Sequence, residues 1–360
     1  MIFVFLVLLV LCTLAIQYRS AERALERLNY QNTLDRDLAE PDQIVTLISM
    51  VRNIGRLPVF YLNFMETLPE KTHPEEDETW QKHHLKRALF GLYCTSTLSL
   101  PAHRRYTRAF RFSLPERGSY LFGKHYVVAG DFLGVRTRYR EGNEEKKLVV
   151  MPRRREDPQL ALTLGGYIGE ISVRRFIFED PVLTIGVREY TGNEPIKQIS
   201  WKQTARTGTL QVKNYDFTAD ANVTVLLNID GGSPEDLERC FETVRTVCEM
   251  LERRRIPYEF YGNGDFYGPK GELGWFYEGL GDQHFRTLMY ALGQTRGVVL
   301  FPFSTMVERC GKRRRTSRGY IVISPPLRDG EREALRTLRR LSETEPCLLI
   351  AKAEEGGTSG

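Results

Sequence analysis

The first 18 residues differ from the rest of the chain because apolar side chains fill almost every position. Residues 1–16 are apolar with one exception, and two more residues extend the run to about 27 Å of helix. No Lys or Arg precedes this run, whereas Arg19, Arg23 and Arg27 follow it directly. The positive-inside rule then places the rest of the chain in the cytoplasm. We therefore predict a single-pass cell-membrane anchor at residues 1–18, with a cleaved signal peptide as the alternative.

The next 140 or so residues change from a helical to a strand-like pattern. Residues 19–29 predict a short juxtamembrane helix, which a linker continues to residue 40. Between residues 41 and 155, short runs of β-branched and aromatic residues are separated by turn-forming residues. The strand candidates are residues 44–51, 59–64, 85–97, 104–113, 120–129 and 147–151. Six short strands in about 110 residues predict an antiparallel β-sandwich of the immunoglobulin-like type.

Residues 216–353 alternate long apolar runs with amphipathic stretches. Residues 221–229 are almost continuously apolar, which is typical of a strand covered on both faces. Further strand candidates are residues 258–261, 320–323 and 347–351, and helix candidates are residues 285–292 and 331–341. This alternation predicts an open, mostly parallel sheet covered by helices on both faces. The whole chain is thus predicted as an α+β multi-domain protein, in which residues 156–215 join the domains and residues 354–360 form a disordered tail.

The helix that follows residues 221–229 has clear start signals. Ser233 suits the N-cap, Pro234 suits the first helical position, and Asp236 completes a capping box. Apolar residues then recur every three or four positions and place Cys240 and Cys248 on one stripe. We therefore predict that both thiols lie in the core.

Composition and charge narrow the function without naming it. Hydrophobic residues make up 41% of the chain and the net charge is only +5, so we expect neither a disordered protein nor a nucleic-acid partner. Six Cys without a C-x-x-C pair argue against a zinc site and a disulfide scaffold. Basic runs at residues 153–155, 253–255 and 312–315 are interpreted either as solvated loops or as contacts for anionic lipid.

The most distinctive motif lies between the two predicted domains, in residues 186–213. Its main positions are Arg188, Tyr190, Gly192, Lys197, Trp201, Lys202, Arg206, Gly208 and Lys213. The motif resembles the signature of the bacterial and archaeal family catalogued as domain of unknown function fifty-eight. Residues 129–134 and 149–152 are also similar to segments of that family. Asn193 and Lys197 depart from the signature, which usually has Asp and Arg at these positions.

The resemblance implies a von Willebrand factor A-type α/β domain at the C-terminus. Such domains often bind Mg²⁺ through a D-x-S-x-S sequence, which supplies one carboxylate and two hydroxyls. Here Asp230 remains, but Gly232 and Pro234 lack the hydroxyls. We therefore predict a degenerate site at Asp230 and Ser233 that holds no metal. Mg²⁺ is the one candidate ion for it, and we expect no other cofactor.

The basic and aromatic residues of the motif have two interpretations. They form a docking surface for an anionic group of a partner, or a structural belt that holds the domains together. The alternation of Ile199, Trp201, Leu210 and Val212 is typical of a half-buried strand and favours the belt. We therefore predict that Trp201 and Arg206 are buried and structural, and that Lys202 and Lys213 are exposed.

No nucleophile has a general base at an informative spacing, so we predict no catalytic residue and identify no small-molecule substrate. The favoured function is a membrane-anchored, non-catalytic adaptor or scaffold that binds a protein partner. Members of the resembled family are commonly encoded beside a MoxR-type AAA+ ATPase, which implies joint work in the assembly or maturation of envelope complexes. The alternative is a hydrolase or another enzyme with an unrecognised site.

Overall fold

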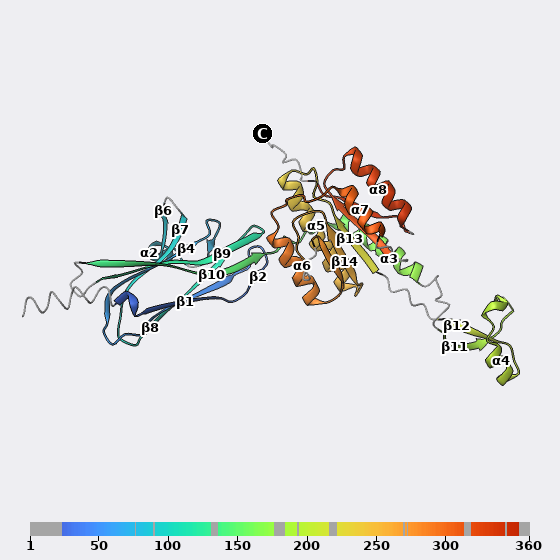
Figure 1. Ribbon diagram of the computed structural model, residues 1–360, viewed down its shortest axis with the longest axis horizontal. Helices are drawn as coiled ribbons and strands as arrows, with labels where there is room; N and C mark the ends of the chain where they lie inside the picture. The colour runs from blue at the N-terminus through green and yellow to red at the C-terminus, as the bar shows by residue number, and fades with distance from the viewer. Residues whose placement is uncertain are drawn as a thin grey trace, which may run out of the picture. The chain divides into compact units, whose positions relative to one another are not determined.

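The protein is represented by a computed structural model in which two compact units are described separately (Figure 1). The described residues are 24–75, 77–88, 91–130, 136–175, 184–192, 194–215, 222–268, 271, 273–312, 318–342 and 344–352. One unit lies within residues 1–153 and 292–294, and the other within residues 154–291 and 295–360. The predicted anchor at residues 1–18 and the predicted tail at residues 354–360 lie outside the described residues. Among the residues that are described, no helix is both long and apolar enough to cross a membrane.

The first unit is built from two sheets whose strands are mainly antiparallel. One sheet has the order β1 (Leu28–Leu34), β3 (Val45–Asn53), β8 (Arg105–Ser113), β5 (His73–Pro74). The other has the order β2 (Leu38–Ala39), β10 (Thr137–Val150), β9 (Gly118–Gly130), β4 (Val59–Leu68), β7 (Gly91–Leu100), β6 (Leu85–Ala88). A short helix, α2 (Glu78–His84), precedes β6.

The alternating strand pattern buries one face of each sheet against the other. Leu47 of β3 and Phe110 of β8 belong to the same buried cluster as Cys94 of β7, Phe122 of β9 and Leu148 of β10. These side chains are at most 1% exposed, as expected where two sheets interdigitate. The predicted β-sandwich architecture is therefore confirmed.

Three predictions within this unit need correction. β1 begins at Leu28, inside the helix predicted over residues 19–29, and continues into the predicted linker, which also contains β2. Leu28 and Tyr30 form strand because they alternate with exposed residues and pack in the core. The single strand predicted over residues 85–97 is two antiparallel strands, with Ala88 opposite Gly91 and a φ of +134° at that glycine. The last strand, β10, is far longer than predicted, because its polar half pairs with β9 while facing solvent.

The second unit contains a five-stranded sheet with the order β15-β14-β13-β16-β17. Its strands are β15 (Trp275–Gly279), β14 (Tyr258–Gly262), β13 (Asn222–Leu227), β16 (Arg318–Ser324) and β17 (Cys347–Ile350). Neighbouring strands are parallel except β14 and β15. The prediction of an open, mostly parallel sheet is confirmed.

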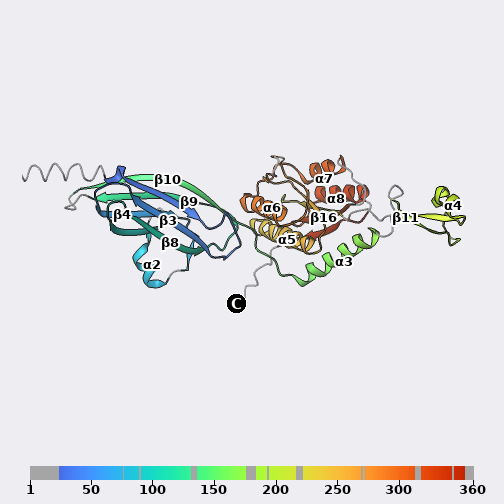
Figure 2. The same ribbon diagram turned by 90° about the horizontal axis from the view of Figure 1, so that it is seen from below.

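Helices cover both faces of this sheet. They are α3 (Pro158–Arg175), α5 (Pro234–Arg253), α6 (Asp282–Gln294), α7 (Phe303–Lys312) and α8 (Asp329–Leu341). Figure 2 shows α7 and α8 on one side of β16, and α3 and α5 on the other. The predicted start of α5 is confirmed, since Ser233 Oγ accepts from Asp236 N at 3.1 Å and Asp236 Oδ2 accepts from Ser233 N at 3.2 Å. Cys240 and Cys248 are both 0% exposed, as predicted.

The motif of residues 186–213 forms a small structure with its own two-stranded sheet. The antiparallel strands are β11 (Thr184–Glu189) and β12 (Gln211–Tyr215). Between them lie a 3-10 turn, η1 (Ile196–Gln198), and a short helix, α4 (Trp201–Thr207). The sequence pattern did not predict α4, nor did it predict α3, α7 or β15.

Candidate functional sites at the end of the sheet and on the signature motif

Three buried polar side chains connect the carboxyl ends of neighbouring parallel strands. Asn228, Asn263 and Ser324 follow or end β13, β14 and β16, and all three are 0% exposed. Asn228 Nδ2 donates to Ser324 Oγ at 3.0 Å, and Asn263 Nδ2 donates to Asn228 Oδ1 at 2.8 Å. The amide oxygens also accept from the backbone N–H groups of Ile229 and Asp230, at 2.9 and 3.1 Å. This network fixes the backbone that carries Asp230.

Asp230 lies beside a guanidinium group rather than beside other oxygen ligands. Its side chain is 35% exposed, and Arg328 Nη1 is 3.9 Å from Asp230 Oδ1. Arg328 Nη2 also lies 3.5 Å from the carbonyl oxygen of Gly231. Gly231 has a φ of +78°, and a Cβ there would lie 2.7 Å from the guanidinium carbon. Glycine at this position therefore lets Arg328 approach the carboxylate.

The oxygen donors near Asp230 do not fit a divalent cation. Gly232 and Pro234 carry no hydroxyl, and Ser233 Oγ accepts the helix N–H described above. Within the described part of the chain, no group of three or more His, Cys, Asp or Glu side chains is placed to hold a metal ion. Mg²⁺ prefers a near-octahedral set of oxygens, which one carboxylate beside an arginine does not supply.

Exposed apolar residues lie on the loops of residues 263–268 and 295–302, which bond to each other at the same end of the sheet. Asp265 clamps these loops together, because its carboxylate accepts from Thr295 Oγ1 and from the N–H of Arg296 at 3.1 Å. Tyr267 on the first loop is 67% exposed, and Val298 and Leu300 on the second loop are 51% and 42% exposed. A rigid loop that presents large apolar side chains to solvent is typical of a contact surface.

The motif of residues 186–213, which we call the signature motif, is held together by one ion pair and several backbone contacts. Arg188 Nη1 lies 2.6 Å from Glu194 Oε1, and Thr191 Oγ1 donates to the same carboxylate at 2.7 Å. The hydroxyl of Thr191, and then Arg188, lower the pKa of Glu194 to about 2. Tyr190 N donates to the carbonyl of Leu210 at 2.9 Å, and its hydroxyl lies 3.4 Å from the carbonyl of Gly192. These contacts account structurally for Arg188 and Tyr190.

A helix interrupts the strand that the apolar alternation predicted. Ser200 N donates to the carbonyl of Gln211 at 2.7 Å, and Gln211 N donates to Thr204 Oγ1 at 3.0 Å, which docks α4 onto β12. Gly208 ends the helix in the left-handed region with a φ of +73°. Ile199 and Val212, at 7% and 1% exposed, fill the small interior.

The buried positions predicted for Trp201 and Arg206 are wrong. Trp201 is 62% exposed and Arg206 is exposed, although Thr204 of the same helix contacts β12. The exposure predicted for Lys202 and Lys213 is confirmed, and Lys197 on η1 is exposed too. Lys202 and Arg206 are four residues apart and so share one side of the helix, and Trp201 directly precedes Lys202 in the sequence. We call Trp201, Lys202 and Arg206 the signature face.

Comparisons with known proteins give remote likenesses only. No protein-family model matches the chain, and no curated protein matches it. The chain is similar to the CARDB domain of a Pyrococcus furiosus protein solved with di-metal ions (14% identity, TM-score 0.21, 35% of this chain and 94% of that chain). It is similar to a cohesin module from a Clostridium perfringens family 33 glycoside hydrolase (9% identity, TM-score 0.24, 34% of this chain and 96% of that chain). It is also similar to a type II cohesin dyad from an adaptor scaffoldin of Acetivibrio cellulolyticus (11% identity, TM-score 0.24, 35% of this chain and 49% of that chain).

Proposed function

We propose that this protein is a membrane-anchored, non-catalytic adaptor that captures a protein partner through the signature face. The observation that carries the proposal is the 62% exposure of Trp201 on the same short helix as two exposed cationic side chains. Leaving an indole in water forgoes the stabilisation that its burial would give. Trp and Arg are also the residue types that dominate the binding energy of protein interfaces.

The charges of the motif indicate which partner surface would fit. Lys197, Lys202, Arg206 and Lys213 are exposed, and none of them has an ion-pair partner among the residues that the structure describes. The nearby Glu194 is committed to Arg188. Ile196 adds apolar surface at 72% exposure. An acidic segment with one or two large apolar side chains would complement this surface.

Four further parts of the proposal rest on the sequence. We propose membership of the family catalogued as domain of unknown function fifty-eight, and an immunoglobulin-like type for the β-sandwich. We also propose a von Willebrand factor A-like character for the α/β unit, and an anchor at residues 1–18 that leaves the bulk of the chain in the cytoplasm. The partner is then a MoxR-type AAA+ ATPase, in the assembly or maturation of envelope complexes.

The hydrolase alternative has no observation in its favour among the described residues. The five described cysteines are buried, and burial raises the pKa of the Cys240 thiol to about 12 and that of Cys347 to about 11. Burial also raises the pKa of the Cys248 thiol. Thiols in this state are protonated at neutral pH and do not supply the thiolate that a cysteine hydrolase needs.

Capture of a purified MoxR-type ATPase from the same genome tests the proposal. Membranes with the full chain are expected to retain the ATPase, and Trp201→Ala and Arg206→Ala are expected to lose at least about tenfold in affinity, as hot-spot residues do. Arg188→Ala is a matched control, because Arg188 serves the internal ion pair with Glu194. Equal capture by wild type and both signature-face variants would refute the docking role.

The proposed topology has its own test. Protease added outside spheroplasts is expected to leave the chain intact and membrane-bound. Digestion of the bulk from outside would overturn the cytoplasmic placement. Recovery of a soluble chain that lacks residues 1–15 would identify a cleaved signal peptide instead.

A further inference from the structure

Two arginine runs about a hundred residues apart in the sequence come together in the α/β unit. Arg154 and Arg155 precede α3, and Arg253 is the last residue of α5. They line one cavity of about 420 Å³, together with Asp157, Thr246 and Glu249. We call this cavity the arginine pocket. Neither the signature face nor the end of the sheet at Asp230 contributes to it.

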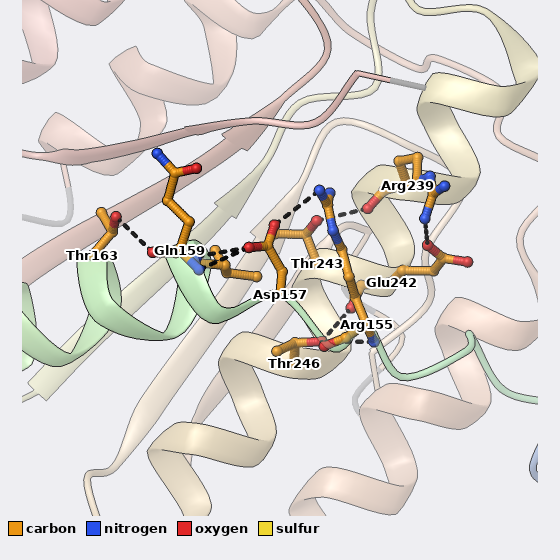
Figure 3. A network of polar contacts seen from close by, with 9 residues as sticks. Arg155, Asp157, Gln159, Thr163, Arg239, Glu242, Thr243 and Thr246 are labelled. Carbon is orange, nitrogen blue, oxygen red and sulfur yellow. Dashed lines mark hydrogen bonds and ion pairs between the residues drawn. The ribbon is translucent and has the colours of Figure 1, made fainter. Parts of the chain in front are cut away.

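The segment before α3 is fixed rigidly along α5. Arg155 N donates to Thr246 Oγ1 at 3.1 Å, and Thr246 Oγ1 lies 3.2 Å from the carbonyl oxygen of Arg155. Asp157 caps α3 by accepting from the N–H of Gln159 at 2.9 Å, and its other oxygen lies 2.9 Å from Arg155 Nη2 (Figure 3). Asp157 and the N-terminus of α3 are therefore already satisfied, and the wall of the pocket is preformed.

Three guanidinium groups converge on a single carboxylate at the other wall. Glu249 lies 2.8 Å from Arg245 Nε, 3.3 Å from Arg154 Nε and 3.8 Å from Arg253 Nη2. Arg245 is 4% exposed, whereas Arg154 and Arg253 are 45% and 65% exposed. In the described part of the chain, Arg154 and Arg253 have no second carboxylate. Each guanidinium has five N–H donors, so most of those on Arg154 and Arg253 stay available to a ligand.

The balance of charge selects the class of ligand. The three arginines that line the pocket, Arg154, Arg155 and Arg253, face the three lining carboxylates of Glu156, Asp157 and Glu249. The lining charges balance, and the buried Arg245, which pairs with Glu249 from outside the lining, leaves the cluster with one net positive charge. A phosphodiester carries one negative charge and presents several oxygens to forked guanidinium donors. Pro158, Ala161 and Met250 add apolar lining for the organic part of such a ligand.

We propose that the arginine pocket binds a phosphodiester group, of a small solute or of an anionic phospholipid headgroup. The ligand's oxygens accept from Arg154 and Arg253, while Glu249 holds the two side chains in place. Binding forms no covalent bond and needs no metal.

Titration of the full chain in a non-ionic detergent tests the proposal with two probes. Dimethyl phosphate represents a soluble phosphodiester, and dihexanoyl phosphatidylglycerol represents a lipid headgroup. Sodium chloride and sodium acetate at matched ionic strength are the reference salts. We expect saturable binding of at least one probe, measured by calorimetry and by a rise in melting temperature. Binding of both probes with similar affinity indicates a soluble ligand, and binding of the lipid analogue alone indicates a membrane lipid.

Single Arg→Gln variants decide whether the binding belongs to the arginine pocket. Arg253→Gln and Arg154→Gln are expected to weaken binding at least about tenfold, since a charge-assisted hydrogen bond is lost. Arg336→Gln on α8 makes the same change of charge at a side chain that is 70% exposed, and should bind like the wild type. Absence of saturable binding of either probe would overturn the proposal. So would unchanged binding by both pocket variants, or an equal loss in Arg336→Gln.

Discussion

Glu66 of the β-sandwich and Glu249 of the α/β unit are both carboxylates held by arginine, but their surroundings differ. Glu66 is 1% exposed and accepts from Tyr30, Ser49 and Arg108 inside the sandwich. Glu249 has a side chain that is 18% exposed and borders the arginine pocket. The arginine–carboxylate pair in the β-sandwich is closed to ligands. The corresponding cluster in the α/β unit leaves guanidinium donors open to solvent. Burial, rather than residue type, separates a structural ion pair from a candidate binding site.

In the buried cluster around Glu66, which we call the closed cluster, Arg108 makes further contacts. Arg108 Nη1 donates to Ser96 Oγ at 2.9 Å, and the guanidinium carbon lies 4.7 Å from the ring centre of Phe64. Burial, and then the charge of Glu66, raise the pKa of the Tyr30 hydroxyl, so that it remains a proton donor to this carboxylate. Few donors are left over, which is why we assign this cluster to stability.

The largest effect is expected from breaking the closed cluster. Arg108→Met leaves Glu66 as an unpaired buried charge and should destabilise the β-sandwich by about 3–5 kcal/mol. The double variant Glu66→Met with Arg108→Met should cost clearly less, because no charge remains unpaired. Urea unfolding followed by the near-ultraviolet signal measures both. A single variant as stable as the wild type would remove the distinction between the two clusters.

An intermediate effect is expected at the closed polar network of the α/β unit. Asn263→Ala removes the acceptor of the buried Ile229 N, and it removes one of the two donors to Asn228 Oδ1. Leaving the buried N–H of Ile229 unsatisfied should cost about 1–3 kcal/mol. Asn143→Ala is the matched control, because the side chain of Asn143 bonds to the exposed Glu145. Thermal melts that fail to separate the two variants would show that this network adds little.

Variants of the signature face and of the arginine pocket should both change the free energy of unfolding very little, because these side chains face solvent. Trp201→Ala is expected to change the free energy of unfolding by no more than about 0.5 kcal/mol, as for other exposed positions, while it weakens partner capture. Arg253→Gln should likewise cost less than about 1 kcal/mol, the usual range for exposed ion pairs. Denaturant melts of both variants measure this. A loss of several kcal/mol for Trp201→Ala would mean that the indole is buried in the intact protein.

The smallest effect on stability is expected at Glu194, which forms a small cluster close to solvent with Arg188 and Thr191. Its pKa is lowered from the usual 4.5 to about 2, chiefly by the hydroxyl of Thr191 and also by Arg188. A lowered pKa means that the contribution to stability is present above about pH 4.5 and is lost as the pH falls towards 2. Thr191→Val should raise the pKa of Glu194 towards its usual value, as measured by carbon NMR of the side-chain carboxyl. An unchanged titration would leave Arg188 as the main cause.

Local patterns predicted the parts of the fold that depend on near neighbours in the sequence. The start of α5 was predictable because Ser233 and Asp236 satisfy each other's N–H groups within one helical turn. The apolar run of β13 was predictable because a strand covered on both faces tolerates few polar residues. The resemblance drew attention to Asp230 in the sequence, but it did not draw attention to Arg328, because Arg328 lies 98 residues further along the chain.

Tertiary structure decided what the local pattern left ambiguous. The sequence by itself determined the two kinds of sheet, the capped helix α5 and the basic character of the runs at residues 153–155 and 253–255. Only the folded chain decided that Trp201 is exposed, because the docking of α4 onto β12 replaces the expected strand. Only the folded chain brought Arg154 and Arg253 to one carboxylate, since side chains a hundred residues apart meet through the packing of the segment before α3 along α5.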